Sequence, residues 1–297
     1  MTFENKAHPS QSEPNQAKPT HANKHALVIE GGAMRGIFAA GVLDGFLDHN
    51  YNPFDFCIGV SAGSTNIASW LSKQRGRTHT IILDYSCQPD FINFKKFTQG
   101  GHWVDLDWLW DHIAKNNPYD MQAFNQQSLP FHVVTTDVES GKPIYIQGNE
   151  SNLEQLTKAS CSLPFAYRNH LKLGGKRMID GGVSDSIPVI EAYKRGAKTI
   201  TVVLSQRLGY QKKPTKAHWL VRRMMKGTPN LAEAIINRAE RYNQTLEFIN
   251  SPPTDCTIHV IAPEDSFQVG RLTTDKTKLE AGYQMGLRAA ERVALGQ

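Results

Sequence analysis

The chain alternates short apolar runs with longer stretches of helical periodicity. Runs of five to eight residues that are rich in branched side chains predict buried strands, and the longer stretches repeat apolar positions at the spacing of a helix. The first unit is a strand at 25–30, which leads through a glycine-rich loop into a helix that begins near Ile37. The second is a strand at 54–60, which leads through a small-residue turn into a helix at 64–73.

The alternation continues to the carboxyl end of the chain. It predicts strands at 131–136, 143–146, 176–179, 199–204 and 257–261, and helices at 153–160, 187–195, 231–249 and 276–294. Strands that alternate with helices indicate a mainly parallel central sheet covered on both faces, which is a three-layer α/β/α fold. Residues 84–119 interrupt the pattern with aromatic residues and turn formers, and we expect a cap or insertion with short helices there.

Composition divides the chain into a tail and a single domain. Residues 1–24 contain only one large apolar residue after the initiator, Phe3, which predicts a disordered polar tail. Residues 25–297 are close to the upper size for one hydrophobic core, so we expect one domain. The tail lacks the apolar segment of a secretory signal, which predicts a cytoplasmic protein. No run of eighteen apolar residues occurs, so we expect any membrane contact to be peripheral.

The four cysteines do not follow metal-ligand spacing. Cys57 and Cys256 lie in apolar runs, and Cys87 and Cys161 lie in mixed segments. Reduced thiols are therefore expected rather than disulfides, and no metal site is predicted.

The net charge of +5 is unevenly distributed. The stretch from Arg207 to Lys226 holds seven basic residues and no acidic one, and apolar residues such as Trp219 and Met224 are interleaved with them. Such a stretch is typical either of a solvated loop and helix face or of a surface that contacts anionic lipid. No nucleic-acid-binding motif accompanies it, so nucleic acid is not expected as a partner.

A candidate nucleophile, Ser61, lies in the pentapeptide Gly59-Val60-Ser61-Ala62-Gly63. The pentapeptide separates a predicted strand from a predicted helix. Gly59 and Gly63 permit the sharp turn of a nucleophile elbow, which presents the serine Oγ at the carboxyl edge of the sheet, above the start of a helix. The alternative is an ordinary tight turn with a small residue at its tip.

The glycine loop after the first strand is a candidate oxyanion hole. It consists of Gly31, Gly32, Ala33, Met34, Arg35 and Gly36. Because most of these residues have little or no side chain, their backbone N–H groups can approach a substrate oxygen at the start of a helix, and Arg35 adds positive charge. The competing interpretation is a nucleotide phosphate loop, but neither a Lys-Ser/Thr pair nor a Gly-x-Gly-x-x-Gly pattern is present.

A serine nucleophile needs a base that accepts its proton. Four histidines follow Ser61 in the chain: His132, His170, His218 and His259. None lies in a convincing loop, since two lie within apolar strand patterns and one lies in the basic stretch. Asp180 is the better candidate, because it ends the strand at 176–179 and the turn Gly181-Gly182 that follows would set its carboxylate at the same edge of the sheet as Ser61.

Three blocks, in this order, resemble the patatin-like phospholipase family: the glycine loop at 31–36, the elbow at 59–63 and the aspartate turn at 180–182. The segments at 135–141 and 159–165 are also similar to bacterial members, so the core motifs extend over 26–188. In the remainder, at 189–297, the pairs Asn237-Arg238 and Tyr242-Asn243 are similar to bacterial members as well. Two departures are minor: Glu30 stands where many members have aspartate, and Ala33 replaces the third glycine.

The resemblance implies a patatin-like serine esterase of the EC 3.1.1 type. It would cleave carboxylic acyl esters of phospholipids or lysophospholipids through a Ser61–Asp180 dyad and an acyl-enzyme, with no metal or dissociable cofactor. The N–H groups of Gly32 and Ala33 would hold the oxyanion. One alternative is an α/β-hydrolase-type carboxylesterase with a Ser-His-Asp triad, which would use a late histidine such as His259; a second is a non-catalytic lipid- or nucleotide-binding module. The first strand lies too close to Ser61 for the α/β-hydrolase order of elements.

Overall fold

The computed structural model describes residues 23–297. The predicted tail lies outside this range except for its last two residues, and the first strand already begins at Lys24. Within the described residues, no helix is both long enough and apolar enough to cross a membrane.

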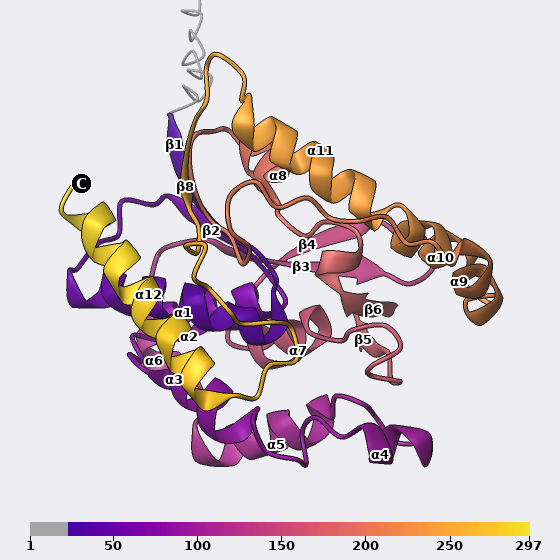
Figure 1. Cartoon of the computed structure of the whole chain (residues 1–297). Coiled ribbons are helices and arrows are strands. Elements are labelled where there is room, and N and C mark those ends of the chain that lie inside the picture. Colours follow the sequence, from indigo (N-terminus) through magenta and orange to yellow (C-terminus); the bar gives the residue numbers. More distant parts are fainter. Residues whose placement is uncertain (1–22) are drawn as a thin grey trace, which may run out of the picture.

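A central sheet lies between two layers of helices, which gives the predicted three-layer α/β/α arrangement (Figure 1). Its strands are β1 (Lys24–Ile29), β2 (Phe56–Val60), β3 (Phe131–Asp137), β4 (Pro143–Gln147), β5 (Leu171–Leu173), β6 (Lys176–Asp180), β7 (Ala197–Val203) and β8 (Thr257–Ile261). They are ordered β5-β6-β3-β2-β1-β7-β8, and β4 also pairs with β3. The centre of the sheet is parallel, as expected, whereas β4, β5 and β6 pair in antiparallel fashion.

The helices reproduce most of the predicted pattern. They are α1 (Gly36–Asp48), α2 (Ala62–Leu71), α3 (Arg77–Thr80), α4 (Phe94–Thr98), α5 (Leu106–Asn116), α6 (Met121–Gln126), α7 (Leu153–Ser160), α8 (Val189–Lys194), α9 (His218–Met224), α10 (Pro229–Ile236), α11 (Arg238–Asn250) and α12 (Lys276–Ala294). The bounds of α7 and α12 match the prediction. The helix predicted at 231–249 is divided, because Asn237 ends α10 and begins α11. Strand β5 was not predicted, and α9 lies in the basic stretch, for which a loop and helix face was one interpretation.

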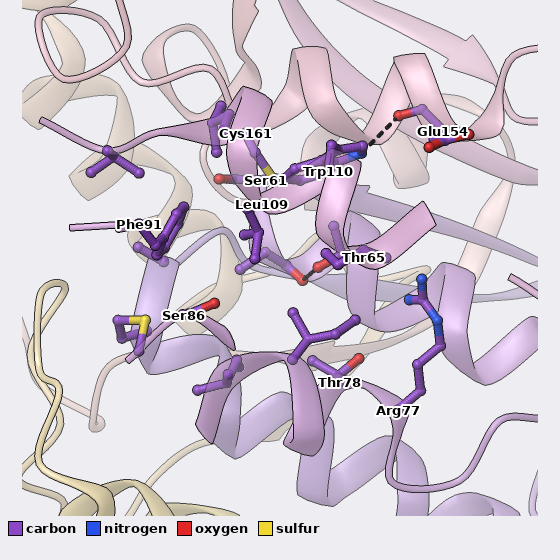
Figure 2. A pocket seen from close by; sticks show the side chains of 18 of the residues that line it. Ser61, Thr65, Arg77, Thr78, Ser86, Phe91, Leu109, Trp110, Glu154 and Cys161 are labelled. Atoms are coloured by element: carbon purple, nitrogen blue, oxygen red, sulfur yellow. Dashed lines mark hydrogen bonds between the residues drawn. The ribbon is translucent and has the colours of Figure 1, made fainter. Parts of the chain in front are cut away.

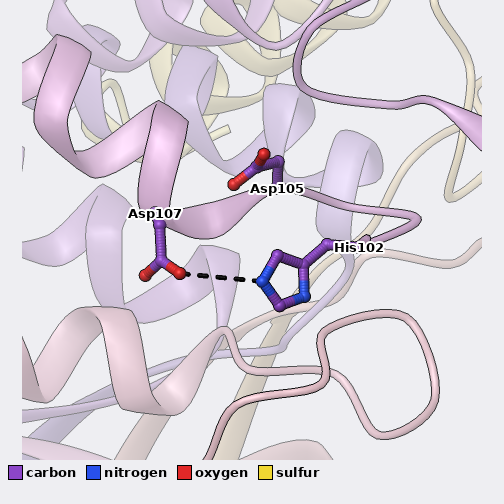
Figure 3. A group of neighbouring side chains, drawn as sticks. All are labelled: His102, Asp105 and Asp107. Carbon is purple, nitrogen blue, oxygen red and sulfur yellow. Dashed lines mark ion pairs between the residues drawn. The ribbon is translucent and has the colours of Figure 1, made fainter. Parts of the chain in front are cut away.

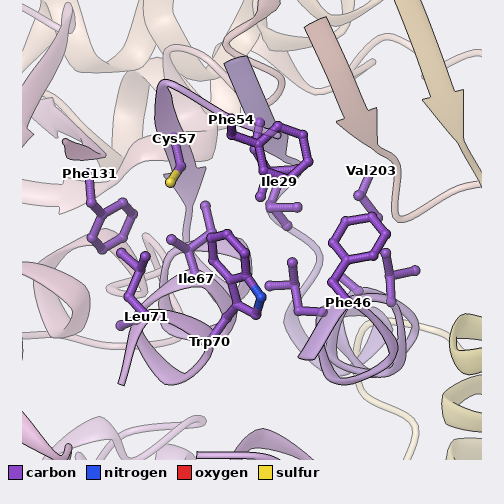
Figure 4. Packing of buried hydrophobic residues seen from close by; sticks show 14 of the residues in the cluster. Ile29, Phe46, Phe54, Cys57, Ile67, Trp70, Leu71, Phe131 and Val203 are labelled. Atoms are coloured by element: carbon purple, nitrogen blue, oxygen red, sulfur yellow. The ribbon is translucent and has the colours of Figure 1, made fainter. Parts of the chain in front are cut away.

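The strands bury both of their faces. Leu27 and Ile29 on β1 pack with α1, α2 and α12, and the alternate residues Ala26 and Val28 pack with α8 and α11 on the other side. This is the two-residue periodicity of a strand that helices cover on both faces. In Figure 4, Trp70 of α2 lies beneath β2 and between the aromatic rings of the first face.

Strands β2 and β6 meet head to head along one edge of β3. Val60, at the end of β2, pairs with Val134, and Asp180, at the end of β6, pairs with the next residue, Thr135. Strand β4 occupies the opposite edge of the same β3 residues. Because β2 is parallel to β3 and β6 is antiparallel to it, the carboxyl ends of β2 and β6 point at each other.

Helices α1 and α12 cross with their backbones in close approach. A Cβ on Gly286 would overlap the carbonyl oxygen of Phe38, and a Cβ on Gly41 would overlap that of Tyr283. Glycine is required at this crossing because the facing atoms belong to rigid backbone. The contact holds the C-terminal helix against the helix that follows the glycine loop.

We predict that Gly286→Ala lowers the free energy of unfolding by about 1–3 kcal/mol, because the added methyl group forces α1 and α12 apart. Urea denaturation would measure this change. Gly227→Ala is the matched control, since a Cβ there meets no atom within 4 Å. Equal denaturation midpoints for the two variants would contradict the account of this crossing.

Candidate active site

Ser61 sits on a strained turn between β2 and α2. Its φ of 52° and ψ of −127° place a non-glycine residue in a region that costs energy, as expected for a nucleophile elbow. The backbone carbonyl of Ser61 accepts hydrogen bonds from the N–H and Oγ of Ser64, at 2.8 and 2.7 Å. The turn is thereby fixed, and the Ser61 side chain is directed to the junction with β6.

The two glycines of the elbow serve close packing, since neither has a positive φ. A Cβ on Gly63 would meet the carbonyl oxygens of Ile29 and Glu30, and one on Gly59 would lie 2.8 Å from the Cα of Ser64. The strain falls on Ser61, and the flanking glycines let β1, β2 and α2 approach one another.

The hydroxyl of Ser61 donates a hydrogen bond to the buried carboxylate of Asp180. The Oγ to Oδ2 distance is 2.8 Å, and Asp180 is 2% exposed. The other carboxylate oxygen, Oδ1, accepts the N–H of Gly182 at 2.7 Å, within the short turn that Gly181 and Gly182 begin. Thr136 donates its hydroxyl to the backbone carbonyl of Asp180 at 2.8 Å. The carboxylate is therefore held in one orientation toward the serine.

Burial raises the pKa of Asp180. The positive charge of Arg238 and the hydrogen bonds from Ser61 and Gly182 act in the opposite direction, and the net effect remains a rise. A carboxylate with a raised pKa accepts a proton more readily than one in water. The pair can thus transfer a proton from the serine hydroxyl to the aspartate.

Ser160, whose role the sequence did not indicate, holds the backbone of Ser61 in place. Its Oγ accepts the backbone N–H of Ser61 at 2.7 Å and donates to the carbonyl of Val134 at 2.6 Å. It is the last residue of α7, and it lies in the segment at 159–165 that resembles bacterial family members. The resemblance of that segment was the sequence signal that could have identified Ser160, although it did not indicate what the serine would contact.

The glycine loop presents two free amides beside the serine. Four of its six N–H groups donate to backbone oxygens: those of Gly31, Met34, Arg35 and Gly36. The N–H groups of Gly32 and Ala33 have no acceptor among the described residues. Ala33 has a φ of 51°, so this position carries the strain that a glycine would avoid. A Cβ on Gly31 would lie 3.1 Å from the Cβ of Ser61, which places the loop directly against the elbow.

Glu30 and Arg35 fasten the loop to the C-terminal half of the chain. Glu30 accepts the N–H of Ser205 at 2.6 Å and the hydroxyl of Tyr242, on α11, at 3.0 Å. Arg35 donates through Nη2 to the Oγ of Ser205 at 3.0 Å. The side chain of Glu30 therefore links the end of β1 to both β7 and α11.

An apolar cavity of about 260 Å³ adjoins Ser61. The segment predicted as a cap supplies much of its wall, including Phe91, Leu109 and Trp110 (Figure 2). Met34 and Ala33 of the glycine loop line it as well. The cavity can therefore hold an apolar chain next to the hydroxyl of Ser61.

Arg77, a buried cation in the cavity wall, holds the end of the cap. Its Nε donates to the carbonyl of Asn117 at 3.1 Å, its Nη1 donates to the Oγ of Ser69 at 2.9 Å, and its guanidinium lies 3.7 Å from the ring centre of Tyr119. It thus joins the chain that follows α5 to helix α2.

No histidine lines this cavity in the part of the chain that the structure describes. His259 lies on β8, three strand positions from β2, which is roughly 14 Å across the sheet. His132 lies on β3, and burial lowers its pKa to about 4. These positions leave Asp180 as the hydrogen-bond partner of Ser61.

His102, Asp105 and Asp107 form a cluster of the kind that can bind a metal ion (Figure 3). The atoms of these side chains that would bind a metal ion already form hydrogen bonds or ion pairs within the chain. Asp107 accepts hydrogen bonds from Tyr167 at 2.6 Å and pairs with Lys158 at 2.7 Å. Asp105 caps the start of α5, and Nδ1 of His102 accepts a backbone N–H. The cluster is a structural connection between the cap and the segment that follows α7.

Comparison with known proteins gives two family matches. Residues 27–193 match the family described as Patatin-like phospholipase, and residues 228–294 match a domain of unknown function, DUF6363. The uncharacterized protein YjjU of Escherichia coli (strain K12) is 31% identical over 280 residues, which are 92% of this chain and 78% of YjjU.

Two further proteins are more distant. Lysophospholipase NTE1 of Eremothecium gossypii is 28% identical over 191 residues, which are 60% of this chain but only 12% of that protein. The crystal structure of VipD from Legionella pneumophila aligns with a TM-score of 0.42 at 11% sequence identity, over 91% of this chain and 67% of that one.

We predict that Asp180→Asn raises the melting temperature by a few degrees near pH 8 and by less near pH 5. The folded-state pKa of Asp180 is raised, so the folded chain binds this proton more tightly than the unfolded chain and the wild type loses stability as the pH rises. Asparagine does not titrate and avoids this loss. Calorimetry across this pH range would measure it.

Asp255→Asn is the control, because the pKa of Asp255 is shifted in the opposite direction. Hydrogen bonds from Lys198 and Tyr193 lower the pKa of Asp255, so its ionised form favours the folded state and its replacement gives no gain at high pH. If the difference between Asp180→Asn and the wild type did not grow with pH, Asp180 would not carry a desolvated charge.

Proposed function

The chain belongs to the patatin-like phospholipase family, and from this membership and the geometry of the site we propose that it hydrolyses carboxylic acyl esters of phospholipids or lysophospholipids, with Ser61 as nucleophile and Asp180 as base. The observation that carries the proposal is the 2.8 Å hydrogen bond from Ser61 Oγ to the buried Asp180, beside an apolar cavity. Family membership supports lipid acyl hydrolysis; the residue roles and the class of lipid are our proposal.

In the first half of the reaction, Asp180 accepts the proton of Ser61 as Oγ attacks the acyl carbonyl carbon. The free N–H groups of Gly32 and Ala33 stabilise the oxyanion that forms. The ester C–O bond then breaks, and Asp180 returns the proton to the departing alcohol oxygen. The acyl group is left on Ser61 as an ester.

In the second half, water replaces the alcohol. Asp180 accepts a proton from the water as its oxygen attacks the acyl-enzyme carbonyl, and the collapse of the tetrahedral species releases the fatty acid and returns a proton to Ser61 Oγ. These steps use groups that the chain itself provides and need no metal or dissociable cofactor.

The cavity suits a single acyl chain. Its wall at Phe91, Leu109 and Trp110 is apolar, and Arg77, which holds the end of the cap, lies in the same wall. The name of the Eremothecium gossypii relative, a lysophospholipase, favours a single-chain lipid as the substrate to test first.

We predict that Ser61→Ala and Asp180→Asn each lower the release of fatty acid by at least about 10³-fold, because the two groups act as one unit. The substrates would be a panel of lysophospholipids, phospholipids, neutral glycerides and p-nitrophenyl esters. A fluorophosphonate probe should label the wild type but not Ser61→Ala. Ser251→Ala, at the exposed end of α11, is the control and should retain both activities.

Two outcomes would favour the alternatives. Activity that survives Asp180→Asn but is abolished by His259→Ala would indicate a Ser-His-Asp triad. A wild type that is neither labelled nor able to release fatty acid from any member of the panel would indicate a lipid- or nucleotide-binding module.

We also propose that the stretch from Arg207 to Lys226 binds the enzyme to an anionic membrane surface. Helix α9 in this stretch packs Val221 inward, while Trp219 and Met224 are 69% and 57% exposed. Four of the seven basic residues are exposed and form no ion pair within the described chain: Lys213, Lys216, Arg223 and Lys226. Exposed aromatic and apolar side chains among basic ones suit the interface of an anionic bilayer.

We predict that the chain sediments with phosphatidylglycerol vesicles at low salt, and less with phosphatidylcholine vesicles or at high salt. Replacing both Arg223 and Lys226 with glutamine should weaken this binding roughly 30-fold, since each basic residue near the surface contributes about 1 kcal/mol. Arg288→Gln, on the exposed side of α12, is the control for the loss of a basic side chain elsewhere on the surface. Vesicle binding that did not depend on salt or on lipid charge would contradict the proposed role of this stretch.

A further inference from the structure

Four cationic side chains gather between the Ser61–Asp180 pair and the C-terminal half of the chain. They are Arg35, Lys212, Arg238 and Arg271. None of them forms an ion pair with a carboxylate within 4 Å among the residues that the structure describes. Residues 228–294, the segment matched by a domain of unknown function, supply two of the four.

Arg238 and Arg271 face the catalytic pair directly. A Cβ on Gly182 would lie 2.9 Å from Oδ1 of Asp180 and 3.1 Å from Nη2 of Arg238, so these two groups border the same small space. Arg271 lines the cavity that contains Ser61, and its backbone carbonyl accepts the N–H of Met34 at 3.4 Å. Arg271 therefore lies at the cavity, and Arg238 lies beside the carboxylate of Asp180.

Arg35 and Lys212, the other two members of the group, lie near the glycine loop and Tyr242. Arg35 packs its Cβ near Gly32, whose N–H is one of the two free amides, and it donates to Ser205. The Nζ of Lys212 lies 4.2 Å from the ring centre of Tyr242, the residue that donates its hydroxyl to Glu30. The charges of Glu30 and Asp180 act on Arg238, and that of Glu30 acts on Lys212 as well, so the basic groups outnumber these two carboxylates.

The cations of this group are partly desolvated and repel one another. Burial lowers the pKa of Lys212 and that of Arg238, the latter to about 10, and in each case a neighbouring arginine lowers it further. The Nε atoms of Arg35 and Arg238 are buried and lack a hydrogen-bond acceptor. Buried donors of this kind are costly unless an acceptor reaches them.

We propose that Arg35, Lys212, Arg238 and Arg271 form an anion subsite that binds the phosphate monoester of a lipid head group while the acyl ester lies at Ser61. A phosphate monoester carries about −1.5 to −2 charges near pH 7, which suits a group of basic side chains, and its oxygens suit guanidinium donors. A choline head group would bring a cation into the same cluster and is disfavoured. The C-terminal segment thus supplies the head-group side of the site.

The choice of a lipid ligand rests on the proposed function, but a binding measurement tests the subsite without any hydrolysis. In Ser61→Ala, we expect calorimetry to give at least about tenfold tighter binding for 1-hexanoylglycerol 3-phosphate than for 1-hexanoylglycerol. Replacing Arg271 with glutamine should remove this preference without opening the core, since Arg271 is exposed. Replacing Arg238 should do the same. Arg288→Gln, from the same C-terminal segment, should preserve it.

The outcomes separate the subsite from the reaction. Equal binding of the two lipids, or a preference that survives Arg271→Gln, would overturn the subsite even if fatty acid is released. A preference that depends on Arg271, in a wild type that releases no fatty acid, would support the subsite and refute the proposed hydrolysis. Inorganic phosphate is the third ligand: if it binds in an Arg271-dependent manner while the two lipids bind equally, the subsite takes free phosphate and the head-group assignment fails.

Discussion

The site depends on one feature of the sheet: β2 and β6 meet head to head along the same edge of β3. Val134 and Thr135 are adjacent in β3, and they pair with the last residues of the two strands. This junction brings Ser61 and Asp180, which are 119 residues apart in sequence, to a hydrogen bond of 2.8 Å. The antiparallel direction of β6 is essential, because a parallel β6 would carry its final residue away from Val60.

Holding this pair in place costs stability. Ser61 adopts a strained backbone conformation, and Asp180 keeps a carboxylate in a buried position where its pKa is raised. Packing elsewhere must offset both costs. The glycines of the α1–α12 crossing and the two apolar faces of the sheet supply rigid support of this kind, since each brings backbone or large side chains into direct contact.

The local sequence pattern predicted much of this structure. The features that it missed depend on pairing between segments that are distant in the sequence. The apolar runs located β1, β2, β3 and β7, and the Gly-x-Ser-x-Gly context located the elbow. The antiparallel direction of β6 could not be predicted, because nothing in five residues specifies the neighbour against which a strand pairs. Ser160 and Arg238 were missed as neighbours of Ser61 and Asp180 for the same reason. The divided helix at Asn237 reflects a local polar residue that helical periodicity ignores.

Arg238 connects the two halves of the site through charge. Its positive charge lowers the pKa of Asp180, against the rise that burial causes. A phosphate group bound at the anion subsite would offset that charge, so the pKa of Asp180 would rise when the head group is in place. A more basic carboxylate accepts the proton of Ser61 more readily. If both proposals hold, the substrate's own phosphate would strengthen the base that acts on its ester, and occupancy of the head-group side would be coupled to chemistry at Ser61.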